Sequence, residues 1–259
     1  MVAEQDAVSD RSDYPRAQSR QDLARNLAVV RGQIAAAAER SGRRPEEVRL
    51  LPVAKTVPEQ RIRLAAQAGC REFGENKVQE ARRKHDNLAE LDIRWSIIGH
   101  LQTNKAKDVA AFAAEFQALD RLRVAQVLDR RLQAVGRGLD VYVQVNTSGE
   151  DSKYGLPPEE TLRFLKELPP FTALRIRGLM TLAVFSDDTD QVRACFARLR
   201  QLRDRVREQN PDLIGPGGLS MGMSGDYEIA VEEGATVVRV GQAIFGARPL
   251  PDSYYWPTT

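Results

Sequence analysis

The stretch "LLPVAKTVPEQRIRLAAQAGCREFGEN", residues 50–76, contains one complete strand–helix–strand unit. Apolar residues at 50–54 predict a buried strand, Pro58 breaks the chain toward a helix over 58–69, and a second short strand is expected at 72–74. Such a unit is typical of parallel strands joined by a crossover helix. Lys55 stands directly at the end of the first strand, although only seven of the 38 Lys and Arg residues are lysine.

The same alternation continues along the chain. Further strands are expected at 95–98, 116–119, 140–146, 175–181, 218–222 and 236–240. Further helices are expected at 76–87, 104–113, 120–136, 158–168, 188–209 and 224–233. Eight strands in roughly 250 residues predict an α/β protein with a single-domain (β/α)8 TIM barrel. The alternative is an open doubly wound sheet, but no Gly-x-Gly-x-x-Gly turn follows an early strand.

A helix is also predicted before the first strand. Ser19 can cap it, Gly42 can close it, and its apolar residues share one stripe. The residues of that stripe are Leu23, Leu27, Val30, Ile34 and Ala38. We expect this helix to cover the part of the barrel surface that would otherwise lack one. The predicted organisation is a flexible tail at 1–18, the barrel at 19–250 and a short tail at 251–259.

Composition excludes several classes of protein. The formal net charge is +2, and basic residues are interleaved with acidic ones, which does not favour nucleic-acid binding. An apolar run of ~18 residues is absent, so no membrane span is expected, and the N-terminus does not resemble a secretory signal. Cys70 and Cys195 form no disulfide framework, and with His85 and His100 as the two histidines a metal site is not predicted. These features predict a cytoplasmic protein.

Lys55 is the candidate reactive residue. In barrels of this kind, function lies on the loops after the carboxyl ends of the strands. Partial burial there lowers the pKa of an amine, and a neutral amine can attack a carbonyl group to form an imine. The alternative is a lysine that extends from the barrel rim into solvent or pairs with an acid.

Two loops near the end of the chain are candidate phosphate sites. Strand seven leads into "SMGMSGDYEIAVEEG", in which Ser224 can cap the next helix and Gly222 and Gly225 let backbone amides approach an anion. Strand eight leads into "VRVGQAIFG", where Gly241 and Gln242 offer backbone amides. Ordinary capping and turn formation would also explain each loop. Both loops opposite a strand-end lysine favour a phosphorylated aldehyde or ketone as the ligand.

Six stretches occur in one order between about residues 50 and 248. They are "VAKTVPEQRI", "AGCREFGENKVQEA", "WSIIGHLQTNKAK", "VQVNTSGEDSKYGL", "RGLMTLA" and "LSMGMSGDYEIAVEEGATVVRVGQAIFGAR". Together they resemble the pyridoxal phosphate (PLP) homeostasis protein family. The resemblance implies a single barrel like the N-terminal domain of alanine racemase, with PLP held as a Schiff base on Lys55.

The resemblance also implies the other residues of the cofactor site. Ser224, Gly241 and Gln242 would surround the phosphate group. The family often has Thr or Ser where this chain has Gln242, so a backbone contact is expected there rather than a hydroxyl contact. Asn76, Ser220 and Met223 complete the implied set, although Asn76 would also suit a helix N-cap.

Arg239 would face the pyridine nitrogen of the cofactor, as the matching arginine does in the related racemase barrel. Arginine donates hydrogen bonds and stays charged, so the ring nitrogen would remain unprotonated and the ring would be a weak electron sink. Transaminases and decarboxylases generally place an acid at this point. From position alone, Arg239 could instead form an ion pair inside the barrel with Glu75 or Asp226.

The predicted function is therefore a monomeric PLP carrier with little or no catalytic activity, which buffers the cofactor or delivers it to apo-enzymes. The first alternative is an amino-acid racemase of the alanine racemase type, with Lys55 as one base. Nothing after residue 250 is long enough for the second domain that supplies the opposite base in that racemase. His100 is a further candidate acid, or a structural residue. The second alternative is a Schiff-base aldolase acting on a sugar phosphate.

Overall fold

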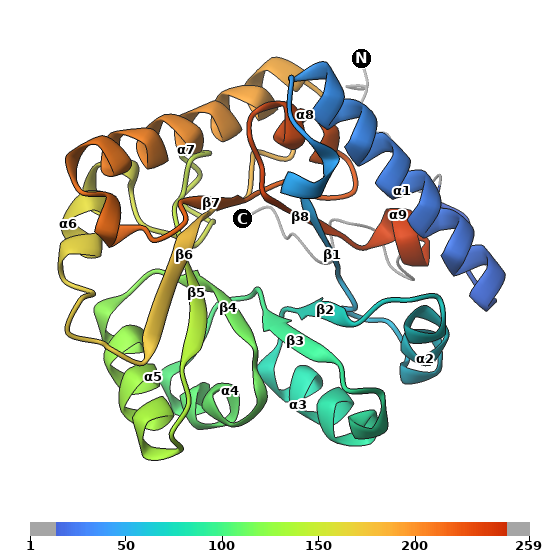
Figure 1. Ribbon diagram of the computed structural model, residues 1–259, viewed down its shortest axis with the longest axis horizontal. Coiled ribbons are helices and arrows are strands. Elements are labelled where there is room, and N and C mark those ends of the chain that lie inside the picture. The colour runs from blue at the N-terminus through green and yellow to red at the C-terminus, as the bar shows by residue number, and fades with distance from the viewer. Residues whose placement is uncertain (1–13, 248–259) are drawn as a thin grey trace, which may run out of the picture.

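A computed structural model describes residues 14–247, and residues 1–13 and 248–259 lie outside the described part. It is a (β/α)8 barrel, as predicted, with the helices arranged around the strands (Figure 1). The strands are β1 (Arg49–Pro52), β2 (Glu72–Glu75), β3 (Arg94–Ile97), β4 (Glu115–Leu119), β5 (Leu139–Gln144), β6 (Leu174–Met180), β7 (Gly218–Ser220) and β8 (Val237–Val240). The helices are α1 (Arg20–Arg40), α2 (Glu59–Gln67), α3 (Val78–Asn87), α4 (Ala106–Phe112), α5 (Leu122–Ala134), α6 (Thr161–Lys166), α7 (Thr189–Gln209), α8 (Tyr227–Glu232) and α9 (Gln242–Phe245).

All strand pairs are parallel, and the strands follow the order β1-β8-β7-β6-β5-β4-β3-β2. The ring closes between β1 and β2 through a single parallel bridge from Val53 to Gly74. There the Ala54 amide donates to the Gly74 carbonyl at 2.9 Å. The seam of the barrel therefore lies beside Lys55.

The observed boundaries differ from the predicted ones mainly at the helix ends. Each strand starts and ends within two residues of its predicted range. The helix expected at 158–168 is divided into a 3-10 turn at Pro158–Glu160 followed by α6. Helix α8 begins three residues after the predicted start at 224, and α9 was not predicted.

Helix α1 lies against α8, α9 and α2, which confirms that the N-terminal helix packs on the barrel (Figure 1). It begins at a capping box in which the Ser19 hydroxyl accepts from the Asp22 amide and the Asp22 carboxylate accepts from the Ser19 amide. All residues of the predicted apolar stripe are buried.

The described part of the predicted N-terminal tail also packs on the barrel. The Tyr14 hydroxyl donates to the Ser224 carbonyl at 2.9 Å, and the Ala247 amide donates to the Tyr14 carbonyl at 2.9 Å. Ala17 is buried, and its amide donates to the Phe245 carbonyl at 3.4 Å. Residues 14–17 are therefore an ordered segment against α9 and not a free tail; the rest of the two predicted tails lies outside the described residues.

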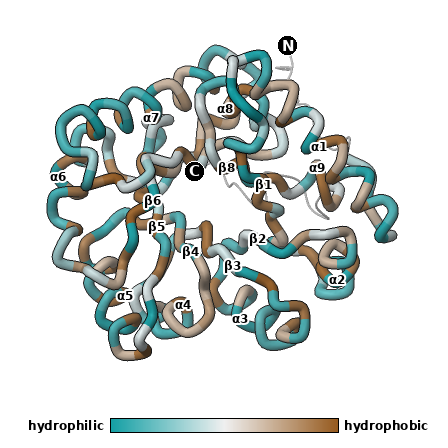
Figure 2. Tube along the Cα trace, in the orientation of Figure 1, coloured by the Kyte–Doolittle hydropathy of each residue, from teal (hydrophilic) through white to brown (hydrophobic). Residues whose placement is uncertain are grey.

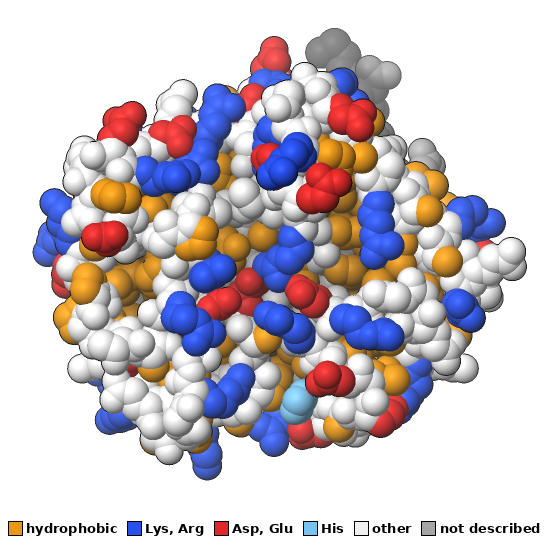
Figure 3. Space-filling view, viewed as in Figure 1, with side chains coloured by type: hydrophobic (Ala, Val, Ile, Leu, Met, Phe, Trp, Pro, Cys, Tyr) orange, Lys and Arg blue, Asp and Glu red, His pale blue; other side chains and the backbone are white. Residues whose placement is uncertain are grey.

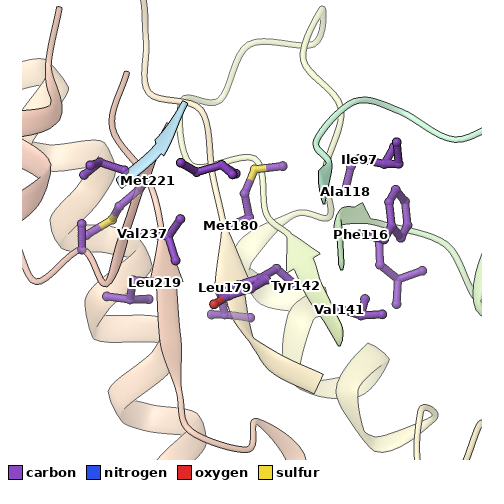
Figure 4. Packing of buried hydrophobic residues seen from close by; sticks show 14 of the residues in the cluster. Ile97, Phe116, Ala118, Val141, Tyr142, Leu179, Met180, Leu219, Met221 and Val237 are labelled. Atoms are coloured by element: carbon purple, nitrogen blue, oxygen red, sulfur yellow. The ribbon is translucent and has the colours of Figure 1, made fainter. Parts of the chain in front are cut away.

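The core is apolar between the strands and helices. Hydrophobic colour runs along β1 in Figure 2, and Figure 4 shows Val141, Leu179 and Leu219 from adjacent strands in the buried cluster. Ion pairs cover the amino-terminal end of the barrel, where Arg49 lies 2.7 Å from both Glu72 and Glu115. Basic and acidic side chains meet over the centre of the barrel in the space-filling view (Figure 3). Between residues 14 and 247, no helix is long and apolar enough to cross a membrane.

Candidate cofactor site

A cavity of about 320 Å³ opens at the carboxyl ends of the strands. This is the end at which barrels of this kind carry their function. Seven of the eight predicted cofactor residues line it, namely Lys55, Asn76, Met223, Ser224, Arg239, Gly241 and Gln242. The eighth, Ser220, is fully buried below the cavity. The fold thus brings together residues from both ends of the sequence.

Lys55 follows β1 and is half-buried in the cavity wall. Of the seven lysines of the chain, which all fall within residues 14–247, only Lys55 lines the cavity. Lys84 is the notable contrast, because it lies in the helix predicted at 76–87 and its side chain is nevertheless buried beside Glu75. Lys55 is therefore the cavity's candidate nucleophile.

Ser224 joins the two candidate phosphate loops. Its hydroxyl accepts hydrogen bonds from the amides of Gly241 at 3.2 Å and Ala243 at 3.3 Å, which are the N-cap and a first-turn residue of α9. The expectation that Ser224 caps α8 is wrong, since Asp226 holds that N-cap position. The loop turns back at this point because the Met223 amide donates to the Asp226 carboxylate. Ser224 therefore points at α9 instead of α8.

The backbone of these loops depends on glycine at two positions. Gly222 has a φ of +96°, and a Cβ atom there would lie 2.6 Å from the Cβ of Ala230. Gly241 lies close to β1, where an added Cβ would lie 3.3 Å from the Val53 carbonyl oxygen. The two loops can thus approach each other and the strand end without side chains between them.

Arg239 extends from β8 and is almost fully buried, with 3% exposure. Its guanidinium donates to the Ser220 hydroxyl at 2.7 Å and to the Thr181 carbonyl at 2.8 Å. Burial lowers the pKa of Arg239 to about 10, while Asp226 and then Glu115 oppose that effect, so the group is charged at neutral pH. The alternative pairing with Glu75 is not formed, because Glu75 pairs with Lys84.

Asn76 lines the cavity just after β2 and does not cap α3 with its side chain, since Lys77 holds the N-cap position. The Asn76 backbone packs tightly on the next loop: a Cβ added at Gly99 would lie 2.3 Å from the Asn76 carbonyl oxygen. The alternative interpretation of Asn76 as an N-cap is therefore not supported, and the residue lies at the cavity instead.

A chain of polar side chains runs from the cavity through the barrel interior. Ser220 accepts from Arg239 and donates to the Gln117 amide oxygen at 2.6 Å. The Gln117 amide nitrogen donates to Glu115, which also accepts from Arg49 at the amino-terminal end. Ser220 thus supports Arg239 from below and does not itself line the cavity.

The cavity mouth is formed by the loop at 146–155 and its neighbours. The rings of His100 and Tyr154 stack with centroids 4.0 Å apart, and both residues line the cavity. Lys153 donates to the Ala183 carbonyl at 2.7 Å, which fixes the loop across the strand ends. Burial, followed by the Arg121 cation, lowers the pKa of His100, so its imidazole is neutral at pH 7.

Positive charge exceeds negative charge around the cavity. Among residues 14–247, its wall includes the cations Lys55, Arg239, Arg16 and Arg61, against the single carboxylate of Asp226. The sequence did not single out Arg16 or Arg61, because arginine is common over the whole chain. This cavity therefore suits a small anionic ligand with a carbonyl group that the Lys55 amine can reach.

Comparisons with known proteins find relatives over most of the chain. The family model described as "Alanine racemase, N-terminal domain" matches residues 23–249. The pyridoxal phosphate homeostasis protein of Pseudomonas aeruginosa is 42% identical over 226 residues, which cover 87% of this chain and 96% of that protein. The protein of the same name from Aquifex aeolicus is 40% identical, with coverage of 86% and 96%.

Solved structures show the same likeness. PipY of Synechococcus elongatus PCC7942, in a structure with PLP bound, is 35% identical with a TM-score of 0.77, covering 86% of this chain and 100% of that one. A protein of unknown function from Bifidobacterium adolescentis is 32% identical with a TM-score of 0.82, with coverage of 91% and 100%. An alanine racemase from Clostridium difficile 630 shares the fold at 16% identity and a TM-score of 0.68, with coverage of 89% and 57%.

Proposed function

Because the chain belongs to the pyridoxal phosphate homeostasis protein family, with the barrel of the alanine racemase N-terminal domain, we propose that it binds PLP in this cavity and takes part in PLP homeostasis. The proposal rests on one observation. Lys55, Arg239 and the hydrogen-bonded pair Ser224 and Gly241 all line the same positively charged cavity. In this proposal the Lys55 amine adds to the aldehyde carbon of PLP, water leaves, and a Schiff base holds the cofactor.

The described residues fit the other groups of PLP. The phosphate would lie at Ser224 and the amides of Gly241 and Gln242, where Gly222 and Gly241 leave the backbone accessible. The Gly241 amide, which donates to Ser224 in this structure, would then donate to the phosphate instead. Arg239 uses two of its five N–H groups on Ser220 and Thr181, which leaves donors for the ring nitrogen. PLP supplies an aldehyde for imine exchange and a ring that can accept electrons.

We further propose that the protein buffers and delivers PLP and has little or no catalytic activity. Arg239 is charged at neutral pH, so the ring nitrogen facing it would stay unprotonated, and carbanion formation would receive little help. Transfer of the imine to another amine needs no carbanion. PLP-dependent apo-enzymes are the acceptors that this chemistry allows, and the two free, buried cysteines agree with a reducing cytoplasm.

The binding proposal is tested by the absorption spectrum of protein mixed with PLP, before and after borohydride. We expect a visible chromophore that borohydride fixes on Lys55, and its loss in Lys55→Ala. Mass spectrometry of the reduced protein locates the adduct. An adduct on Lys77, Lys105 or Lys153 instead would refute the assignment.

The carrier proposal is tested by chiral product analysis beside a transfer assay on one preparation. We expect transfer of PLP to an apo-enzyme, and no racemisation of L-alanine near the typical turnover number, which is on the order of 10 per second. Racemisation at that rate, abolished in Lys55→Ala, would establish the alternative, a single-domain racemase.

A further inference from the structure

Lys55 occupies the second position of a four-residue turn, Ala54 to Val57. The Val57 amide donates to the Ala54 carbonyl at 3.0 Å, which closes the turn. Thr56, the third residue, has a φ of +64°. This combination is typical of a type II turn, in which glycine is preferred at the third position and a β-branched residue is strained. The backbone directly after Lys55 therefore needs support from its surroundings.

Lys84 supplies a contact to this turn from below. Its ammonium group donates to the Ala54 carbonyl at 2.8 Å, so that carbonyl accepts both the turn's own hydrogen bond and one from α3. The same ammonium donates to the carboxylate of Glu75 at the end of β2. Lys84 thus connects the carboxyl ends of β1 and β2. These two strands form the seam of the barrel, which the single Val53–Gly74 bridge closes.

The Lys84–Glu75 pair is unusually deeply buried. The side chains are 2% and 0% exposed, and one carboxylate oxygen of Glu75 has no hydrogen-bond partner among the described residues. Removing two charges from water costs more free energy than an apolar pair of similar size would, so stability alone is a poor explanation for the pair. Buried ion pairs in some proteins instead select one conformation of the groups around them, and such a role would explain this pair better than stability does.

The neighbours of the pair show which geometry it fixes. Ala54 precedes Lys55 and Glu75 precedes Asn76, and both Lys55 and Asn76 line the cavity. Lys84 and Glu75 are not among the described residues that line it. The backbone of the two strand ends is therefore the direct connection between the pair and the cavity.

We propose that Lys84, held by Glu75, is a positioning residue for Lys55: it fixes the strained Ala54–Val57 turn so that the Lys55 amine enters the cavity at the angle imine formation requires. This inference rests on the proposed PLP function of Lys55. It predicts that loss of the pair slows covalent capture of the cofactor without weakening the cavity's hold on the phosphate and ring.

The test compares two ligands, PLP and pyridoxamine 5′-phosphate, which has the same ring and phosphate but no aldehyde. The variant is Lys84→Met combined with Glu75→Gln, because Lys84→Met alone would leave a buried carboxylate without its partner. We expect the rate of formation of the borohydride-fixed Lys55 adduct to fall tenfold or more. The dissociation constant for pyridoxamine 5′-phosphate should stay within about twofold of the wild-type value.

Circular dichroism and thermal melting of each variant show whether the barrel is intact. If the double variant does not fold, Glu75→Gln alone answers the same comparison, since it keeps the volume of the side chain and removes the anion that holds Lys84. Lys77→Met, on the exposed start of α3, is the matched control and should leave both ligands unaffected.

Equal weakening of both ligands would mean that the pair has a general structural role, and unchanged adduct formation would mean that it does not position Lys55; either result overturns the inference. Absence of a Lys55 adduct in the wild-type protein is a different result, because it overturns the proposed function as well.

Discussion

Ser224 is the residue at which the two candidate phosphate loops meet, since its hydroxyl accepts from Gly241 and Ala243. We expect Ser224→Ala to weaken PLP binding. The loss of one neutral hydrogen bond costs roughly 0.5–1.5 kcal/mol, which corresponds to a decrease in affinity of about two- to twelvefold, and the loss of a charge-assisted bond costs more. A fluorescence or absorbance titration measures it. Ser41→Ala, at the far end of α1, is the control, and unchanged affinity in Ser224→Ala would exclude the serine from the site.

Cys70 gives a second prediction at the level of single residues. Burial raises the pKa of its thiol to about 11, so the reactive thiolate is scarce near neutral pH. Cys195 is buried as well. We expect neither thiol of the native protein to react with an aromatic disulfide reagent at about pH 8, and both to react after unfolding. Rapid labelling of the folded protein would contradict the packing around α2 and α7.

Among the elements, α1 has an unusual position. It precedes the first strand in the chain, yet it completes the outer layer of helices beside α8 and α9, the last two helices. The Asn26 side chain donates to the Ile244 carbonyl in α9 at 3.0 Å. At the other end, Arg40 lies 3.0 Å from Glu228 and 2.9 Å from Glu232. Helix α1 is thus attached to the segments that carry the candidate phosphate loops.

The capping box of α1 predicts a dependence of stability on pH. Hydrogen bonds, first from the Ser19 side chain, lower the pKa of Asp22 below its usual 3.8. A lowered pKa in the folded state means that the contribution to stability is present above pH ~4 and is lost as pH falls through the folded pKa. Asp22→Asn should remove this part of the acid dependence. Thermal melts between about pH 2 and 6 test it, and identical profiles of the two proteins would contradict it.

Across the whole molecule, the polar chain from Arg239 to Arg49 connects the cavity with the opposite end of the barrel. Buried polar groups are costly when they lose a partner, so a fully connected chain favours one arrangement of the barrel interior. The orientation of Arg239 is therefore set by residues far from the cavity.

Gln117→Leu should interrupt this chain, because the Ser220 hydroxyl would lose its acceptor and Glu115 would lose one of its donors. We expect a loss of about 1–3 kcal/mol in the free energy of unfolding, which denaturant titration measures. Gln201→Leu, on the exposed face of α7, is the control and should change stability by less than ~0.5 kcal/mol. Equal stability of the two variants would show that the chain contributes little.

The sequence was sufficient to predict the barrel, because a short apolar run of three to seven residues marks each strand and helical spacing marks the segments between them. It also predicted seven of the residues that line the cavity. It was insufficient for α9, whose four residues are too few to show a period. It also missed the Lys84–Glu75 pair, since a lysine within a charged helix normally faces solvent.

The pairing of β1 with β8 has a consequence for the order of synthesis. A ribosome releases Lys55 first and Arg239, Gly241 and Gln242 much later. At roughly 5–20 residues per second, the delay is on the order of 10 to 40 seconds. During that time the lysine exists without the loops that would hold an anion beside it. In the proposed function, loading of the cofactor would therefore follow translation, and a nascent chain stalled before its last strand would carry Lys55 without a bound cofactor.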